Sequence, residues 1–161
     1  MLAGQDVSKQ VDAEFGRIFG RQYGLIEAYR CAGADLILVT SGTIASTARV
    51  AVDEMRERGK KVGMVKVRLF RPFPREELLE VLAGVEKVAV IDRNVSFGIG
   101  GIFAQELRAA FCNEKIRPLV YSYIAGLGGR DVTPPVLYEL VEETYKRPEP
   151  EAQSRWIGLR S

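Results

Sequence analysis

The chain repeats one pattern three times: an apolar, β-branched run ends in a short polar or glycine-bearing loop, and a helical pattern follows. The loops are Ser41-Gly42-Thr43, Arg71-Pro72-Phe73-Pro74 and residues 94–101. Alternating strands and helices predict a parallel α/β sheet, because a helical crossover returns the chain to begin the next parallel strand. Loops that follow parallel strands meet at one edge of the sheet, where such folds usually hold ligands or partners.

The same periodicities predict the individual elements. Strands are expected over residues 25–29, 35–40, 62–70, 87–92 and 117–124. Helices are expected over residues 43–58, 74–82, 102–111 and 133–145. The first of these strands is short and mixed in composition, so residues 25–29 equally suit a turn of helix.

A further helix is expected near the start, because Val7, Val11, Phe15, Ile18 and Phe19 fall on one helical face. We expect this helix to pack beside the sheet or on another domain, since its apolar face needs a partner. The sequence is therefore divided into a linker helix at 1–22, an α/β domain at 23–147 and a polar tail at 148–161. The tail cannot form a helix or strand in isolation, and Trp156 and Ile157 are the residues expected to dock it.

Composition restricts the class of protein. A chain of 161 residues that is 47% hydrophobic can bury one compact core. Its 23 Lys and Arg against 21 Asp and Glu give a net charge of +2, too balanced for non-specific binding of nucleic acid. No apolar run approaches the roughly 20 residues that cross a bilayer, and the N-terminus resembles no signal peptide. We therefore expect a cytoplasmic protein with neither nucleic acid nor membrane as a partner.

The sequence contains no histidine, so no Ser-His or Cys-His nucleophile can form. Its two cysteines, Cys31 and Cys112, are far apart and lack the spacing of zinc or iron–sulfur ligands, which predicts two buried free thiols. We predict no catalytic residue and no metal site in this chain.

The loop at residues 94–101 places several backbone N–H groups and Ser96 at the start of a helix, an arrangement that favours anions. The phosphate-binding pattern G-x-G-x-x-G is incomplete because Phe103 stands where glycine is needed, so a tight chain reversal is the favoured interpretation. Thr43 or Ser41 is expected to cap the helix that follows. If strands 35–40 and 87–92 are neighbours, a crevice lined by Ser41, Thr43, Ser96 and Gly98 lies between the two loops.

Other loop residues are candidates for contacts with a partner. Arginines around the Pro-Phe-Pro turn could anchor another subunit, although a solvated face explains any one of them. The Arg130-Asp131 pair can cap a helix or form an ion pair, and such pairs are more often structural than catalytic. The predicted interface residues are Arg71, Phe73, Asn94, Ser96, Phe97, Arg130 and Asp131.

Five segments taken together resemble a known family. They are YGLIEAYR at 23–30, DLILVTSG at 35–42, GKKVGMVKVRLFRPFP at 59–74, VAVIDRNVSFGIGG at 88–101 and GLGGRDVTP at 126–134. This series closely resembles the C-terminal part of the alpha subunit of pyruvate:ferredoxin oxidoreductase, the part that looks like a transketolase C-terminal domain. The resemblance implies a three-layer α/β/α fold with a mostly parallel five-stranded sheet and one antiparallel edge strand.

The resemblance also implies a function. In that family a 2-oxoacid is decarboxylated on thiamine diphosphate, electrons leave through iron–sulfur clusters to ferredoxin, and the acyl group passes to coenzyme A. The cofactor lies between a pyrimidine-binding domain of the alpha subunit and a pyrophosphate-binding domain of the beta subunit. We therefore expect a structural and subunit-contact domain that binds no cofactor itself and is inactive alone. The alternatives are a free-standing anion- or nucleotide-binding module and a docking domain of another thiamine-dependent complex.

Overall fold

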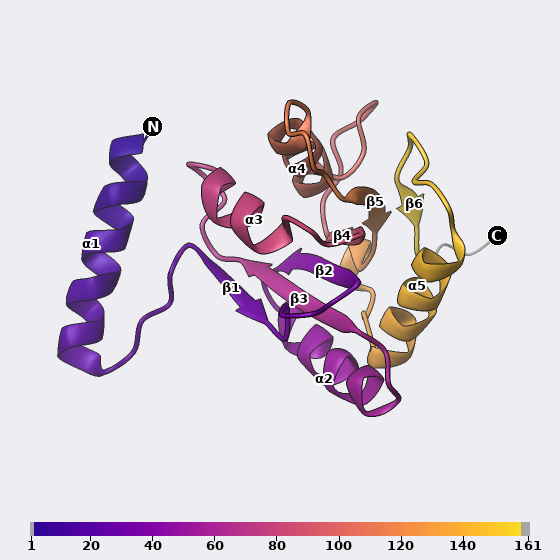
Figure 1. The fold of residues 1–161 in the computed structure, drawn as a ribbon, viewed down its shortest axis with the longest axis horizontal. Coiled ribbons are helices and arrows are strands. Elements are labelled where there is room, and N and C mark those ends of the chain that lie inside the picture. Colours follow the sequence, from indigo (N-terminus) through magenta and orange to yellow (C-terminus); the bar gives the residue numbers. More distant parts are fainter. Residues whose placement is uncertain (1, 159–161) are drawn as a thin grey trace.

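The computed structural model describes residues 2–158 and shows one mostly parallel sheet between two layers of helices (Figure 1). The strands are β1 (Ile26–Tyr29), β2 (Leu36–Ser41), β3 (Val62–Val67), β4 (Lys87–Asp92), β5 (Leu119–Ile124) and β6 (Arg155–Trp156). Their spatial order is β1-β3-β2-β4-β5-β6. Only β1 pairs antiparallel to its neighbour, which confirms the predicted α/β class with one antiparallel edge strand.

Two helices cover each face of the sheet. The helices are α1 (Leu2–Phe19), α2 (Ile44–Glu57), α3 (Arg75–Leu82), α4 (Ile102–Phe111), the short 3₁₀ turn η1 (Leu127–Gly129) and α5 (Pro134–Lys146). One apolar core joins α2 and α5 to the sheet, and a second joins α3 and α4 to the opposite face. This arrangement is the three-layer α/β/α architecture.

The central strand β2 explains why its sequence is apolar throughout. Leu36 and Leu38 belong to the core under α2 and α5, whereas Ile37 and Val39 belong to the core under α3 and α4. All four side chains are at most 2% exposed. A strand covered on both faces must be apolar at successive positions, because side chains alternate between the faces.

The chain reverses its direction of travel across the sheet at β2, which pairs with β3 on one side and β4 on the other. The helices that follow β2 and β4, namely α2 and α4, lie on opposite faces of the sheet. The loops after these two strands therefore separate at the carboxyl edge. Such a switch point is where open α/β sheets commonly place their sites.

Several boundaries and the number of strands differ from the prediction; β5, for example, begins at Leu119 rather than at residue 117. β3 ends at Val67 rather than at residue 70, because the N–H groups of Arg68 and Leu69 both donate to the Leu25 carbonyl at 3.0 Å and the chain turns there. The sheet has six strands rather than five, because residues 155–156 of the tail pair with β5. The tail is held by this neighbour and by an N–H bond from Ile157 to the Ile124 carbonyl at 2.9 Å.

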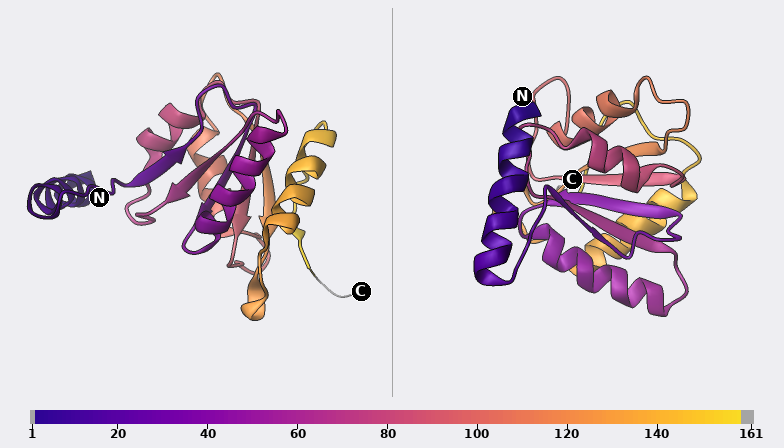
Figure 2. Two further views of the ribbon diagram at one scale, coloured as in Figure 1. Left: turned by 90° about the horizontal axis from the view of Figure 1, so that it is seen from below. Right: turned by 60° about the vertical axis from the view of Figure 1, so that its left-hand side comes forward.

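The helix α1 lies outside the three layers (Figure 2). It is tied to the domain by polar contacts: Gln5 Nε2 donates to the Phe73 carbonyl at 2.7 Å, and Lys9 forms an ion pair with Glu77 at 2.7 Å. Four of its large apolar side chains are more than half exposed, namely Val7, Val11, Ile18 and Phe19, whereas Phe15 is half-buried. Within residues 2–158, no helix combines the length and the apolar character that crossing a bilayer requires.

Candidate functional site

Four loops gather at the carboxyl edge of the sheet, because β2, β3, β4 and β5 all run in the same direction. They follow β2 at residues 42–43, β3 at 68–74, β4 at 93–101 and β5 at 125–133. This edge holds the residues that the sequence nominated for an anion crevice and for partner contacts, apart from Ser41 at the end of β2. We call it the loop edge.

Asp92, the last residue of β4, organises the loop that follows it. Its carboxylate is fully buried and accepts the N–H groups of Phe103 at 2.9 Å and Ala104 at 3.2 Å. Burial raises the pKa of Asp92, while these two N–H groups lower it. A Cβ added at Gly101 would lie 2.2 Å from Asp92 Oδ2, so the close approach requires glycine there. Asp92 is therefore the anion that the start of α4 holds.

The remaining donors at the start of α4 are also bonded within the chain. The Ile102 N–H donates to Asn94 Oδ1 at 3.1 Å, and the Gly101 N–H donates to Ser154 Oγ at 3.1 Å. Ser154 in turn shares a hydrogen bond with Ser122 of β5 at 2.6 Å. Because the first three N–H groups of α4 all have partners, an external anion would have to displace a buried carboxylate or Asn94. This observation does not favour the anion-binding alternative at residues 94–101.

The start of α2 differs from its prediction. Thr43 has helical backbone angles and its side chain makes no capping bond; instead its hydroxyl accepts Arg93 Nη1 at 3.2 Å. The reason is geometric, since a residue with a helical backbone does not aim its side chain at the following N–H groups. A cavity of about 150 Å³ lies here, and its charged lining residues are Arg93, Arg130 and Asp131.

The four residues of the predicted crevice do not share one cavity. Thr43 lines the hollow described above, whereas Ser96 and Gly98 line a separate hollow of about 220 Å³ beside Trp156. Ser41 lines neither hollow and is half-buried at the end of β2. An anion site at this crevice stays a prediction, and its residues are divided between two neighbouring surfaces.

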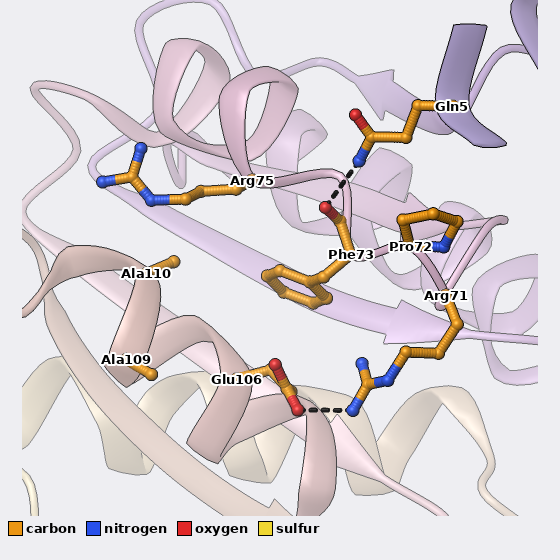
Figure 3. A pocket seen from close by; sticks show the side chains of 8 residues that line it. All are labelled: Gln5, Arg71, Pro72, Phe73, Arg75, Glu106, Ala109 and Ala110. Carbon is orange, nitrogen blue, oxygen red and sulfur yellow. Dashed lines mark hydrogen bonds and ion pairs between the residues drawn. The ribbon is translucent and has the colours of Figure 1, made fainter. Parts of the chain in front are cut away.

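The turn at residues 71–74 lines a hollow of about 540 Å³ (Figure 3). Arg71 forms an ion pair with Glu106 and lies 3.9 Å from the centre of the Phe70 ring. The Phe73 side chain packs against the core under α3 and α4 and is half-buried, and its role as an interface residue stays a prediction. Arg75 likewise pairs with Glu114 at 2.6 Å.

The predicted thiols lie in different surroundings. Cys31 is half-buried, its Sγ lies 3.2 Å from the Met64 carbonyl, and burial raises its pKa. Cys112 is exposed at the end of α4, which corrects the expectation that both thiols are buried. Cys112 follows the last residue of α4, where the helix ends in solvent. The hydrophobic periodicity of the sequence does not predict the exposure of a residue at that position. Among residues 2–158, no three His, Cys, Asp or Glu side chains gather as a metal site would require.

Residues 34–137 match the family of the pyruvate:ferredoxin oxidoreductase core domain II. The chain belongs to this family. The match runs from just before β2 into α5 and thus includes β2, β3, β4 and β5 together with all four loops of the loop edge.

Relatives extend the likeness beyond this core domain. The pyruvate synthase subunit PorA of Methanothermobacter thermautotrophicus is 46% identical over 160 residues, which cover 99% of this chain and 40% of that subunit. The ketoisovalerate oxidoreductase subunit VorA of Pyrococcus horikoshii is 48% identical over 128 residues, covering 79% of this chain and 32% of that subunit. The chain therefore spans about 40% of the length of the PorA subunit that it matches.

A solved structure of an oxidoreductase has the same fold. It is the 2-oxoglutarate:ferredoxin oxidoreductase of Magnetococcus marinus, with 2-oxoglutarate, coenzyme A and succinyl-CoA bound. The TM-score is 0.61 and the identity 25%, over 83% of this chain and 21% of that one. In this core domain II chain the loop edge is thus part of a fold that recurs within a larger oxidoreductase.

The sequence did not nominate three residues that organise the loop edge: Asp92, Arg93 and Ser154. Asp92 carried a readable signal, because a carboxylate ends the otherwise apolar segment VAVID. The other two act through contacts with segments far away in the sequence, such as Ser154 with Gly101, and carry no local signal. Trp156, which was expected to dock the tail, lies in β6 beside β5.

Proposed function

We propose that this core domain II chain is the structural and subunit-contact domain of a thiamine-diphosphate-dependent 2-oxoacid:ferredoxin oxidoreductase. In the complete enzyme it braces the catalytic domains, and alone it carries out no turnover. The observation that carries the proposal is the PorA relative, which is 46% identical over 99% of this chain but extends well beyond it. A domain conserved as part of a longer subunit acts with the rest of that subunit.

The buried charges of the chain support a bracing role. Lys87 Nζ donates to the carbonyls of Thr144, Tyr145 and Arg147 at 3.1, 3.0 and 2.8 Å, and so caps the end of α5. Asp92 caps the start of α4 in the same way. Both groups hold helices against the sheet through these hydrogen bonds.

The proposed partners and cofactors follow from the family resemblance. The partners are the pyrimidine-binding domain of the same subunit and the other subunits of the oxidoreductase, with ferredoxin as the electron acceptor of the whole complex. Thiamine diphosphate, iron–sulfur clusters and coenzyme A belong to that complex. Two cysteines cannot supply the four thiolates that usually hold a cluster, so clusters must lie on other domains. Free thiols also suit a reducing, cytoplasmic location.

Pyruvate is the first 2-oxoacid to test, because PorA is named a pyruvate synthase subunit. VorA, named for ketoisovalerate, is similar at a comparable 48% identity, and the solved structure holds 2-oxoglutarate. Three substrates thus accompany one fold, which supports the view that substrate choice is made outside this domain.

A hybrid subunit tests the proposal. The segment of the Methanothermobacter PorA that this chain matches is replaced by this chain, and the hybrid is produced together with its partner subunits. We expect assembly and pyruvate-dependent reduction of ferredoxin or a dye, each within about tenfold of the parent enzyme. A hybrid that folds but neither assembles nor reduces the acceptor would contradict the proposed function.

A further inference from the structure

Phe97 is the most exposed large apolar side chain that the structure describes, at 95% of its full surface. It lies at the tip of the loop between β4 and α4. Ile99 and Trp156 beside it are 58% and 45% exposed, and both line the same hollow of about 220 Å³. We call Phe97, Ile99 and Trp156 the aromatic tip. Contiguous exposed apolar groups of this kind commonly mark protein contacts.

The loop that carries the tip is held in one shape. Ser96 and Gly100 exchange backbone hydrogen bonds of 2.8 and 2.9 Å. Gln105 Nε2 donates to the Ile99 carbonyl at 2.9 Å, and Ser154 accepts the Gly101 N–H. A loop whose backbone is already fixed loses little conformational freedom on binding, so such a loop is suited to serve as an anchor.

The charges next to the tip are mostly positive, with two arginines and one aspartate. Arg93 and Arg130 are exposed, and within residues 2–158 neither guanidinium has a carboxylate partner within 4.0 Å. They line one hollow with Asp131 at the start of α2, where the helix dipole adds further positive potential. By contrast Arg155 is paired with Glu143 at 3.0 Å. A partner that covers this surface must therefore bring negative charge.

We propose that the aromatic tip is an anchor that inserts into an apolar pocket rimmed by carboxylates, on a part of the same oxidoreductase outside this chain's sequence. The tip fills the pocket, and Arg93 and Arg130 pair with the rim. A second copy docking through the same surface does not fit, because it would bring the same excess of arginines over carboxylates. The inference rests on the proposed function and names the surface through which the contact is made.

The test uses the hybrid PorA in its complete oxidoreductase, with the photoreactive amino acid p-benzoylphenylalanine at position 97. We expect irradiation to give one dominant cross-link, to a peptide outside this chain's sequence that is apolar and contains Asp or Glu. The double variant Arg93→Glu/Arg130→Glu should lower the cross-linking yield at least tenfold. Arg117→Glu, an exposed arginine before β5 at the opposite edge, should leave the yield unchanged.

A matched pair of variants separates contact from folding. Phe97→Ser and Ile116→Ser both remove an exposed apolar group, since Ile116 is 73% exposed before β5. In the chain alone we expect neither variant to move the unfolding midpoint. In the hybrid oxidoreductase only Phe97→Ser should increase the fraction that dissociates on dilution, by about tenfold or more.

Three results overturn the inference. They are the absence of a cross-link, a cross-link to another copy of this chain, and a yield insensitive to the arginine reversals. If the hybrid assembles and is active while any of these occurs, the proposed function stands and the anchor is refuted. If the unmodified hybrid fails to assemble, both are refuted.

Discussion

Helices α1 and α2 have similar amphipathic sequence patterns, but they differ in how far their apolar faces are buried. In α2 the apolar side chains lie against the sheet, and Ala48, Val52 and Met55 are at most 3% exposed. In α1 two side chains of the equivalent stripe, Val7 and Val11, remain more than half exposed. An amphipathic sequence pattern therefore predicts a helix with an apolar face. Whether that face is buried depends on a neighbouring element of the fold, which the pattern does not reveal.

A second pair of side chains sharpens the comparison. Asp92 and Asp12 each accept two backbone N–H groups, Asp12 from Tyr23 at 2.8 Å and Gly24 at 2.9 Å. Burial raises the pKa of Asp92, whereas the two N–H groups hold the pKa of Asp12 in α1 below its ordinary value. The same kind of contact, a carboxylate that accepts two backbone N–H groups, thus lies in the core for Asp92. For Asp12 it lies at the surface, where it attaches α1 to the segment that follows it.

The largest expected effect is in α2. Replacing Met55 by Ala removes a side chain that is 3% exposed, and we expect a loss of about 2–4 kcal/mol in the free energy of unfolding. Urea unfolding of the isolated chain measures this loss. Val50→Ala, at a position on the same helix that is 48% exposed, should change the value by less than about 0.5 kcal/mol. Equal effects at both positions would contradict the described packing of α2.

Removing the buried cap should have the next largest effect. Asp92→Ala leaves the Phe103 and Ala104 N–H groups without partners, and we expect a loss of about 1–3 kcal/mol. Hydrogen exchange at these two amides should accelerate more than exchange in α5. Unchanged protection at Phe103 and Ala104 would show that the carboxylate is not their partner.

Substitution in α1 should have little effect on the isolated chain. Val11→Ser changes a side chain that is 59% exposed, so we expect less than about 0.5 kcal/mol in the free energy of unfolding. The measurement is the same urea series as for Met55→Ala. A loss comparable to that of Met55→Ala would mean that the stripe of α1 is buried in solution, and would break the contrast between the two helices.

The smallest effect concerns pH. Because the folded pKa of Asp12 lies below its ordinary value of 3.8, its stabilising contact is complete above that pH and is lost as pH falls through the lowered folded value. The sign is reversed for Asp92, whose raised folded pKa makes the fold less stable as pH rises from 3.8 to that folded value. NMR titration of the Tyr23 and Gly24 amides should show the Asp12 transition, and Asp12→Asn should abolish it.

The sequence was sufficient to predict those elements that are determined by residues within the element itself. The apolar run at 35–40 predicted β2, and Pro74 with Glu76 and Glu77 predicted the start of α3, because proline and acidic residues suit a first helical turn. The adjacency of β2 and β4, which was the condition for the predicted crevice, is present in the structure. Phe97 was nominated as a contact residue, and its exposure makes it available for that role.

Other features depend on contacts distant in sequence, and the sequence could not reveal them. The strand β6 exists because β5 offers a free edge to a polar tail. The hydroxyl of Thr43 turned to Arg93, 50 residues away, rather than to the helix that it begins. Ser154 reaches Gly101 across 53 positions. In each case the local structure is determined by residues that are distant in the sequence.

The central claim is that this domain provides structure and contacts while the chemistry lies elsewhere. The most direct measurement is ferredoxin or dye reduction by the purified chain alone, with pyruvate, coenzyme A and thiamine diphosphate, beside the hybrid oxidoreductase. The account predicts no reduction above the buffer rate for the chain alone and clear reduction by the hybrid. Substrate-dependent reduction by the chain alone would contradict it.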